Sequence, residues 1–136
     1  RQIEFALFDL SIHKHNPALN ATQVQATLDD IRQKYAVVPT ASYNRFQHSF
    51  SHIFAGGYAA GYYSYKWAEV LASDAFDRFE KEGVFNTQTG KEFRQFILAV
   101  GGKDTALDAF INFRGREPKI DALLRHQGWT NASKNT

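Results

Sequence analysis

Residues 20–35 read NATQVQATLDDIRQKY and set the expectation for the whole chain. The apolar side chains of this stretch recur three or four residues apart, which is the spacing of one face of an α-helix. Asn20 stands where a helix N-cap is wanted, and Val38-Pro39 interrupts the pattern beyond the far end. We therefore predict a helix over residues 21–35. Its apolar face consists of Val24, Leu28, Ile31 and Tyr35.

The same spacing recurs along the rest of the chain. Near the N-terminus, apolar side chains lie on two sides of one predicted helix, which is typical of a helix buried between neighbours. Gly83 and Gly128 suit C-terminal caps, and Pro118 suits a first helical turn. No segment alternates convincingly with the period of two that a half-buried strand shows. We predict an all-α fold, with further helices over residues 3–12, 58–82, 91–100, 105–113 and 118–126.

The composition is that of a folded chain with one modest core. The chain has 136 residues, 43% of them hydrophobic, no cysteine and a net charge of +2. These values exclude a disulfide scaffold and a thiolate metal site, and so mild a charge gives no reason to expect a nucleic-acid partner. No apolar run is long enough to span a bilayer, so no membrane partner is expected. Because the chain starts at Arg1 without methionine, we expect a fragment whose natural N-terminus is missing.

Charge is distributed unevenly along the chain. Residues 35–65 carry one formally charged side chain, that of Arg45, and are rich in aromatic residues, glycines and histidines. Such a segment is not an ordinary solvated surface, so we expect it to be buried or to line a cleft. Between residues 114 and 125, four basic side chains are interleaved with Glu117 and Asp121. That mixture favours a solvated helix with local ion pairs over a basic patch.

His48 and His52 are the first candidates for chemistry. On one helix, residues i and i+4 share a face, which is how the HExxH motif of zinc peptidases presents two ligands. Here Ser49 occupies the place of the glutamate, and no acidic residue is in sequence reach to complete the site. We therefore expect no metal ligand in this chain. Each histidine is expected to hydrogen-bond in a polar pocket or to pack.

A tyrosine cluster is the second candidate. On a helix, Tyr58, Tyr62 and Tyr65 would form one stripe, and the stripe could belong to a core or to a cleft. Three buried phenolic hydroxyls would all need partners, so we favour a wet cleft. A tyrosine hydroxyl is a neutral donor that can hold a peptide carbonyl or stabilise an oxyanion, and His52 adds a further donor. The neighbouring Gly56, Gly57 and Gly61 do not follow the GxGxxG order of a dinucleotide site.

Three stretches together resemble a known family. They are FSHIFAGGYAAGYYSYKW at residues 50–67, RQIEFALFD at residues 1–9, and FRGREP at residues 113–118 followed by DALL at residues 121–124. They are similar to the C-terminal part of the thimet oligopeptidase (M3) family of zinc metallopeptidases, most closely to its bacterial members. The resemblance covers residues 1–129 and leaves residues 130–136 as a polar tail that we expect to be disordered.

The resemblance implies an all-helical metallopeptidase whose deep channel admits short, unstructured peptides. Residues 1–129 would form the multi-helix C-terminal part of its catalytic domain. In that family a HExxH helix and a later glutamate bind zinc, and these residues lie upstream of the matched region. The chain alone is therefore expected to hold no zinc and to cleave nothing. The implied partners are peptide substrates and the missing N-terminal part of the same polypeptide, and the implied location is cytoplasmic.

The resemblance also implies residue roles. Carried over by position, His52, Tyr58 and Tyr65 correspond to catalytic family residues that hold the substrate backbone and stabilise the tetrahedral intermediate. Tyr62 corresponds to a substrate contact, and the glycine-rich stretch with Gly56, Gly57 and Gly61 to a flexible loop over the substrate.

The alternative function is a stand-alone helical peptide-binding module without catalysis. The fragment hypothesis differs from it by predicting exposed apolar surface on the helix over residues 3–12, where missing sequence would pack.

Overall fold

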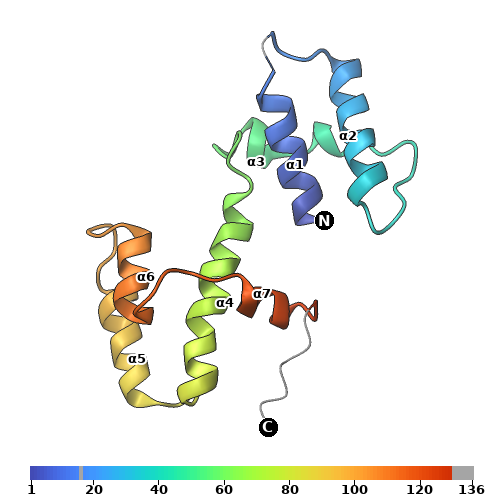
Figure 1. The fold of residues 1–136 in the computed structure, drawn as a ribbon. Coiled ribbons are helices and arrows are strands. Elements are labelled where there is room, and N and C mark those ends of the chain that lie inside the picture. The colour runs from blue at the N-terminus through green and yellow to red at the C-terminus, as the bar shows by residue number, and fades with distance from the viewer. Residues whose placement is uncertain (16, 130–136) are drawn as a thin grey trace. The chain divides into compact units, whose positions relative to one another are not determined.

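The computed structural model describes residues 1–15 and 17–129 (Figure 1). Within these residues every regular element is a helix, so the all-α prediction is confirmed. The chain divides into two compact units, residues 1–66 and residue 67 onward, and each has a hydrophobic core of its own. The predicted tail, residues 130–136, lies outside the described residues. No helix in the described part combines the length and the apolar character needed to cross a bilayer.

The first unit packs α1 (Gln2–His13) and α2 (Ala21–Tyr35) with two short segments, the 3₁₀-helix η1 (Phe46–His48) and α3 (Ser51–Phe54). Aromatic rings dominate its core. The rings of Phe5 and Phe46 stack with centroids 4.1 Å apart, and the Phe50 ring lies 4.6 Å from that of Phe46. The buried core residues are Phe5, Phe8, Leu28, Ile31, Phe50 and Ile53.

Helix α2 has the predicted bounds. Asn20 caps it by accepting a hydrogen bond from the backbone N–H of Gln23, while the Gln23 side chain accepts one from the Asn20 N–H. This reciprocal pair satisfies two amides that the helix itself leaves unpaired. Arg32 of α2 then joins the helix to α1 through Glu4 at 3.1 Å and to the following loop through Asn44 at 3.0 Å.

Helix α1 shows the two-sided apolar surface expected from its sequence, but only one side is covered. Phe5 and Phe8 are buried in the core, whereas Ile3 and Leu10 are 43% and 40% exposed. This exposed apolar surface is the feature that the fragment hypothesis predicts for the helix.

The second unit consists of α4 (Ser64–Glu82), α5 (Thr87–Phe93) with its π-helical continuation η2 (Arg94–Leu98), α6 (Ala106–Arg114) and α7 (Asp121–His126). Helix α4 begins just before the boundary of the units. The core of the second unit is formed by Ala75, Phe110 and Phe113, with Phe79 and Phe93 packed at its edge. The Phe113 ring lies 5.4 Å from that of Phe93 in an edge-to-face arrangement, which aromatic pairs prefer.

The long helix is shorter than predicted. Helix α4 begins at Ser64, and residues 58–63 form turns instead of its first part. Ala60 within these turns takes a left-handed φ of +55°, which a right-handed helix cannot contain. The far end agrees with the prediction, because α4 ends at Glu82 and Gly83 follows with φ of +104°.

Two other predicted helix starts are wrong. Helix α5 begins before the predicted residue 91, because the Asn86 side chain accepts hydrogen bonds from the amides of Gln88 and Thr89 and so caps an earlier start. Helix α7 begins at Asp121 and excludes Pro118, and the Lys119 N–H just before it is bound by a side chain of α4. Helix α6, by contrast, begins and ends within one residue of its prediction.

The weakly charged segment, residues 35–65, is not buried as a whole. Val37 and Tyr43 are 91% and 83% exposed, and Phe54 is 56% exposed. The burial prediction is therefore wrong for much of this segment. A hollow forms along residues 36–45. Aromatic rings gather in the second half of the segment, residues 52–65, and these rings form the candidate site described below.

Basic residues at the end of α6 and beyond it bind α4 rather than forming local ion pairs. Asp74 of α4 is 1% exposed and accepts hydrogen bonds from Arg114, Arg116 and the Lys119 N–H. Burial by itself would raise the pKa of Asp74, but the hydrogen bonds from Arg116 and the Lys119 N–H, with the charges of Arg116 and Arg114, lower it below the ordinary 3.8. The network holds the segment between α6 and α7 against α4.

We expect Asp74→Asn to lower the free energy of unfolding by ~3 kcal/mol, because it removes the buried anion that pairs with Arg116 and is shared with Asp77 as a partner of Arg114. Lys81→Gln is the control: its ammonium contacts Asp77 on the same helix but is 69% exposed, so its loss should cost less than ~1 kcal/mol. Urea unfolding followed by circular dichroism measures both. Equal costs would contradict the structural role of Asp74.

The same comparison has a pH dependence. Because the pKa of Asp74 is lowered in the folded state, its stabilisation is present above pH 3.8 and is lost as the pH falls further, so the unfolding free energies of wild type and Asp74→Asn should converge at low pH.

Candidate functional site

The rings of His52, Tyr58, Tyr62 and Tyr65 meet in the first unit, and we call them the aromatic cluster. The His52 ring lies 5.9 Å from that of Tyr58, 5.6 Å from Tyr62 and 6.1 Å from Tyr65. The Tyr65 ring stacks on that of Tyr58 at 5.3 Å and lies 5.2 Å from Tyr62. The structure thus brings together the four side chains that the sequence singled out.

The cluster is not the helical stripe that the spacing predicts. His52 lies on the single turn of α3, Tyr58 and Tyr62 lie in the turns of residues 58–63, and Tyr65 lies in the first turn of α4. The chain reverses through these turns, and that reversal stacks Tyr58 on Tyr65. The four rings therefore depend on the shape of the turns rather than on helical periodicity.

Three of the four rings are exposed. Tyr58 and Tyr65 are each 37% exposed, and His52 is exposed as well. Tyr62 is half-buried and is packed on the core, with its ring 5.0 Å from that of Phe50. One member thus fixes the cluster to the core while the others present polar atoms to the outside.

The Tyr65 hydroxyl is held in its neutral form. A hydrogen bond with the Tyr58 hydroxyl raises the pKa of Tyr65 above the ordinary 10.0, and partial desolvation and the neighbouring Tyr62 add to the effect. A phenol with a raised pKa keeps its proton at neutral pH. It can therefore donate a hydrogen bond to a carbonyl or to an oxyanion, and it cannot act as a base.

Two glycines shape the start of the turns. A Cβ on Gly56 would lie 3.0 Å from the carbonyl oxygen of His52, which is too close without a shift of the backbone. Gly57 has φ of +76°, which favours glycine. Gly61 differs, because a Cβ there would meet the Tyr58 carbonyl oxygen at 3.5 Å, an ordinary contact. The close approach of the turn to His52 thus requires glycine at the first two positions only.

Asp9 is the residue of this site that the sequence did not reveal. It lies on α1 with no exposed surface, and its carboxylate accepts hydrogen bonds from the backbone N–H groups of Ala60 and Tyr62 at 2.8 and 2.9 Å. The signal available in the sequence was a carboxylate inside an apolar helix. That signal does not identify a partner more than fifty residues away.

The two histidines do not share a helix face. His48 ends η1 and His52 lies in α3, with Ser49 and Phe50 in non-helical conformations between them. Among residues 1–15 and 17–129, no group of three or more His, Cys, Asp or Glu side chains is placed to hold a metal ion. The described residues therefore do not fit a zinc site, and the shared helix face considered for His48 and His52 does not form.

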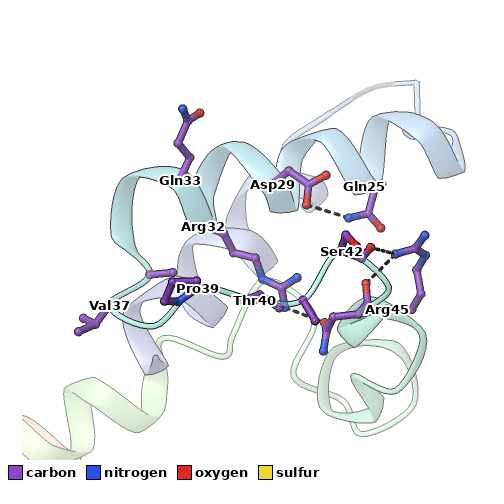
Figure 2. A pocket seen from close by; sticks show the side chains of 12 residues that line it. Gln25, Asp29, Arg32, Gln33, Val37, Pro39, Thr40, Ser42 and Arg45 are labelled. Carbon is purple, nitrogen blue, oxygen red and sulfur yellow. Dashed lines mark hydrogen bonds between the residues drawn. The ribbon is translucent and has the colours of Figure 1, made fainter.

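A separate hollow of about 560 Å³ lies between α2 and the loop of residues 36–45 (Figure 2). Its lining includes Arg32, Asn44 and Arg45 and no member of the aromatic cluster. The guanidinium of Arg45 donates to the carbonyl oxygens of Ser42 and Asn44, and Arg32 donates to Glu4 and Asn44. Both guanidinium groups hold the loop in place, so the hollow results from the way this loop packs beside α2.

We expect the isolated chain to bind less than one zinc ion per molecule at neutral pH, because two separated imidazoles make at most half of a tetrahedral site. Isothermal titration with zinc, repeated on His48→Ala, measures the stoichiometry. Tight one-to-one binding that disappears in His48→Ala would contradict this expectation.

We expect Tyr58→Phe to lower the pKa of Tyr65 toward 10.0, because it removes the hydrogen bond that contributes most to the raised value. A pH titration of the tyrosine Cζ resonances by NMR measures it, with the Tyr65 signal assigned by its absence in Tyr65→Phe. Tyr63→Phe, outside the cluster, should leave the Tyr65 titration unchanged. An unchanged pKa in Tyr58→Phe would contradict the coupling.

Comparison with known proteins identifies relatives over nearly the whole chain. Residues 1–129 match the model of Peptidase family M3. The chain is 55% identical over 128 residues to oligopeptidase A of Escherichia coli (strain K12), a match that covers 94% of this chain and 19% of that protein. It is 53% identical over 131 residues to oligopeptidase A of Haemophilus influenzae, covering 96% and 19%. It is 48% identical over 137 residues to the probable cytosolic oligopeptidase A of Arabidopsis thaliana, covering 98% and 20%.

The chain thus spans about a fifth of the length of these relatives. The family model covers all three stretches on which the resemblance was based, and the resemblance is confirmed. This chain belongs to Peptidase family M3.

Proposed function

We propose that this chain is the C-terminal part of a zinc-dependent oligopeptidase that hydrolyses short, unstructured peptides. Its contribution is a wall of donors that binds the substrate and stabilises the oxyanion formed during hydrolysis. The observation that carries the proposal is the aromatic cluster, in which four polar rings are held together with exposed hydroxyl and imidazole groups. Membership of a peptidase family supports it.

Tyr65 and Tyr58 are proposed to act as donors at the scissile carbonyl. The Tyr65 hydroxyl is a neutral donor at neutral pH, a form that its raised pKa favours further, and it is proposed to donate to the oxygen on which negative charge develops. A well-placed donor of this kind is worth about 2.7–4 kcal/mol at the transition state. His52, within ring contact of both tyrosines, is proposed to add a further donor. These groups bind and polarise; they do not generate a nucleophile.

Tyr62 and the glycine-rich turn are proposed to bind the rest of the peptide. Tyr62 is fixed against the core and presents one face to the cluster, which suits contact with a substrate side chain or backbone. Gly56, Gly57 and Gly61 leave the backbone uncovered by side chains, which allows a peptide strand to approach closely.

Zinc is implied by the family, yet the described residues of this chain do not fit it. We therefore assign the ion and its ligands to sequence outside this chain. The partners proposed are short peptides and the upstream part of the same polypeptide. A cytoplasmic location is proposed as well, in line with the Arabidopsis relative that is named as a probable cytosolic enzyme.

In the full-length protein, Tyr65→Phe is expected to lower kcat by tenfold or more, about 1.4 kcal/mol at the transition state, because it deletes a donor and little else. Hydrolysis of a short quenched fluorescent peptide measures it. Tyr63→Phe is the matched control: it removes a hydroxyl from a neighbouring tyrosine that is 52% exposed and lies outside the cluster. Thermal unfolding of both variants should match the wild type.

Unchanged kcat/KM in Tyr65→Phe would remove the oxyanion role and leave the cluster as a peptide-binding surface. If the wild-type protein binds peptides but cleaves none, the peptide-binding module without catalysis replaces the peptidase as the function. Equal losses in Tyr65→Phe and Tyr63→Phe would point to a general effect of the substitutions rather than to chemistry.

A further inference from the structure

Asp9 is the most deeply buried carboxylate of the first unit that lies next to the proposed site. Its side chain has no exposed surface. Oδ1 accepts a hydrogen bond from the Ala60 N–H at 2.8 Å, and Oδ2 accepts one from the Tyr62 N–H at 2.9 Å. The Nδ1 atom of His13, one turn further along α1, lies 2.9 Å from Oδ1. Both oxygens of the carboxylate are thus engaged, and a main-chain segment rather than a charged side chain supplies two of the three contacts.

The segment that Asp9 binds has little else to fix it. Residues 58–63 form turns, and their own hydrogen bonds are short-range: the Gly61 N–H donates to the Tyr58 carbonyl and the Ser64 N–H to that of Gly61. Residues 54–60 are all exposed. The segment is also joined to the rest of the unit by the Tyr58 N–H, which donates to the His52 carbonyl oxygen, and by the Tyr62 ring, which packs on Phe50 and Phe5. Asp9 therefore provides the polar attachment of the turn to the helix beneath it.

The geometry of the turn matches a carboxylate in particular. Ala60 has φ of +55°, in the left-handed region that a non-glycine residue rarely adopts. Amides at positions i and i+2 around such a residue converge and form a concave anion site. Here the anion is the side chain of Asp9, so the strained turn and the buried carboxylate satisfy each other. The two N–H groups bind different oxygens of Asp9, so an amide side chain in the same orientation would point its NH2 group at one of them, donor against donor.

We propose that Asp9 is a positioning residue for the aromatic cluster. By fixing the amides of Ala60 and Tyr62, it sets where the turn carries Tyr58 and Tyr62 relative to Tyr65 and His52. Asp9 touches no substrate and acts through these rings. The proposal rests on the proposed function, because it gives the donors of that site their fixed placement.

The first experiment compares Asp9→Asn and Asp9→Ala in the full-length protein, with Glu4→Gln as the matched control. Glu4 is a second buried carboxylate of α1, but it contacts Arg32 and not the turn. We expect a tenfold or larger loss of kcat in Asp9→Asn and a larger one in Asp9→Ala, because displacing a donor by ~1 Å can cost ~100-fold. Glu4→Gln should change kcat less than about twofold, since Glu4 binds Arg32 and leaves the contact of Asp9 with the turn intact.

A double-mutant cycle separates positioning from a general loss of stability. Because Asp9 holds the turn that carries Tyr58, the loss of kcat caused by Asp9→Asn should shrink to about twofold or less in the Tyr58→Phe background. The same loss in both backgrounds would overturn the proposal, since a merely structural effect is independent of the Tyr58 hydroxyl.

Hydrogen exchange in the full-length protein tests the anchor without reference to activity. Asp9→Asn should increase exchange of the amides in a peptide spanning residues 57–63, while a peptide from α2 stays protected and Glu4→Gln leaves residues 57–63 unchanged. Unchanged protection of residues 57–63 in Asp9→Asn would overturn the proposal. Lost protection with unaltered kcat would instead confirm that Asp9 anchors the turn and would count against the catalytic role of the cluster.

Discussion

The turn of residues 58–63, which carries half of the aromatic cluster, is tied to α1 by two hydrogen bonds between residues far apart in the chain, from the amides of Ala60 and Tyr62 to the carboxylate of Asp9. The turn that they hold contains a left-handed alanine and lies on the surface, so local preferences do not maintain its shape. A carboxylate with no exposed surface would in turn be costly without donors. The carboxylate gives the turn a partner that holds its shape, and the amides of the turn give the buried carboxylate its donors. The arrangement of the aromatic rings follows from this contact.

Sequence reasoning succeeded where the structure obeys local rules. The bounds of α2 follow from its apolar period and from the Asn20 cap, all within residues 20–35. The end of α4 at Glu82 follows from Gly83 for the same reason. Such features can be read from one stretch because the groups that satisfy each other are neighbours in the chain.

The arrangement of the candidate site does not follow from local sequence rules. The sequence picked His52, Tyr58, Tyr62 and Tyr65, and the structure brings their rings together, yet the helical stripe used to group the tyrosines does not exist. The turn replaces that stripe because a residue of α1 binds its amides, a contact that no periodicity reports. The second unit gives another example. The mixed charges of residues 114–125 predicted local ion pairs, whereas Arg114 and Arg116 bind Asp74 on α4.

The placement of Asp9 beneath the turn suits a site that works by donating hydrogen bonds. Donors aimed in advance at a developing charge lower the barrier because nothing has to reorganise during the reaction. By itself, a surface turn with exposed tyrosines would not keep the hydroxyl groups pointing in one direction, because ordering flexible exposed side chains costs conformational entropy. Attaching the turn through main-chain amides fixes the rings while leaving the hydroxyls of Tyr58 and Tyr65 uncommitted to the core. Because the two amides bind one carboxylate oxygen each and His13 lies against Oδ1, the anchor has hydrogen-bond partners at both oxygens, and under the proposed function an oxyanion near the rings would meet donors rather than a bare anion.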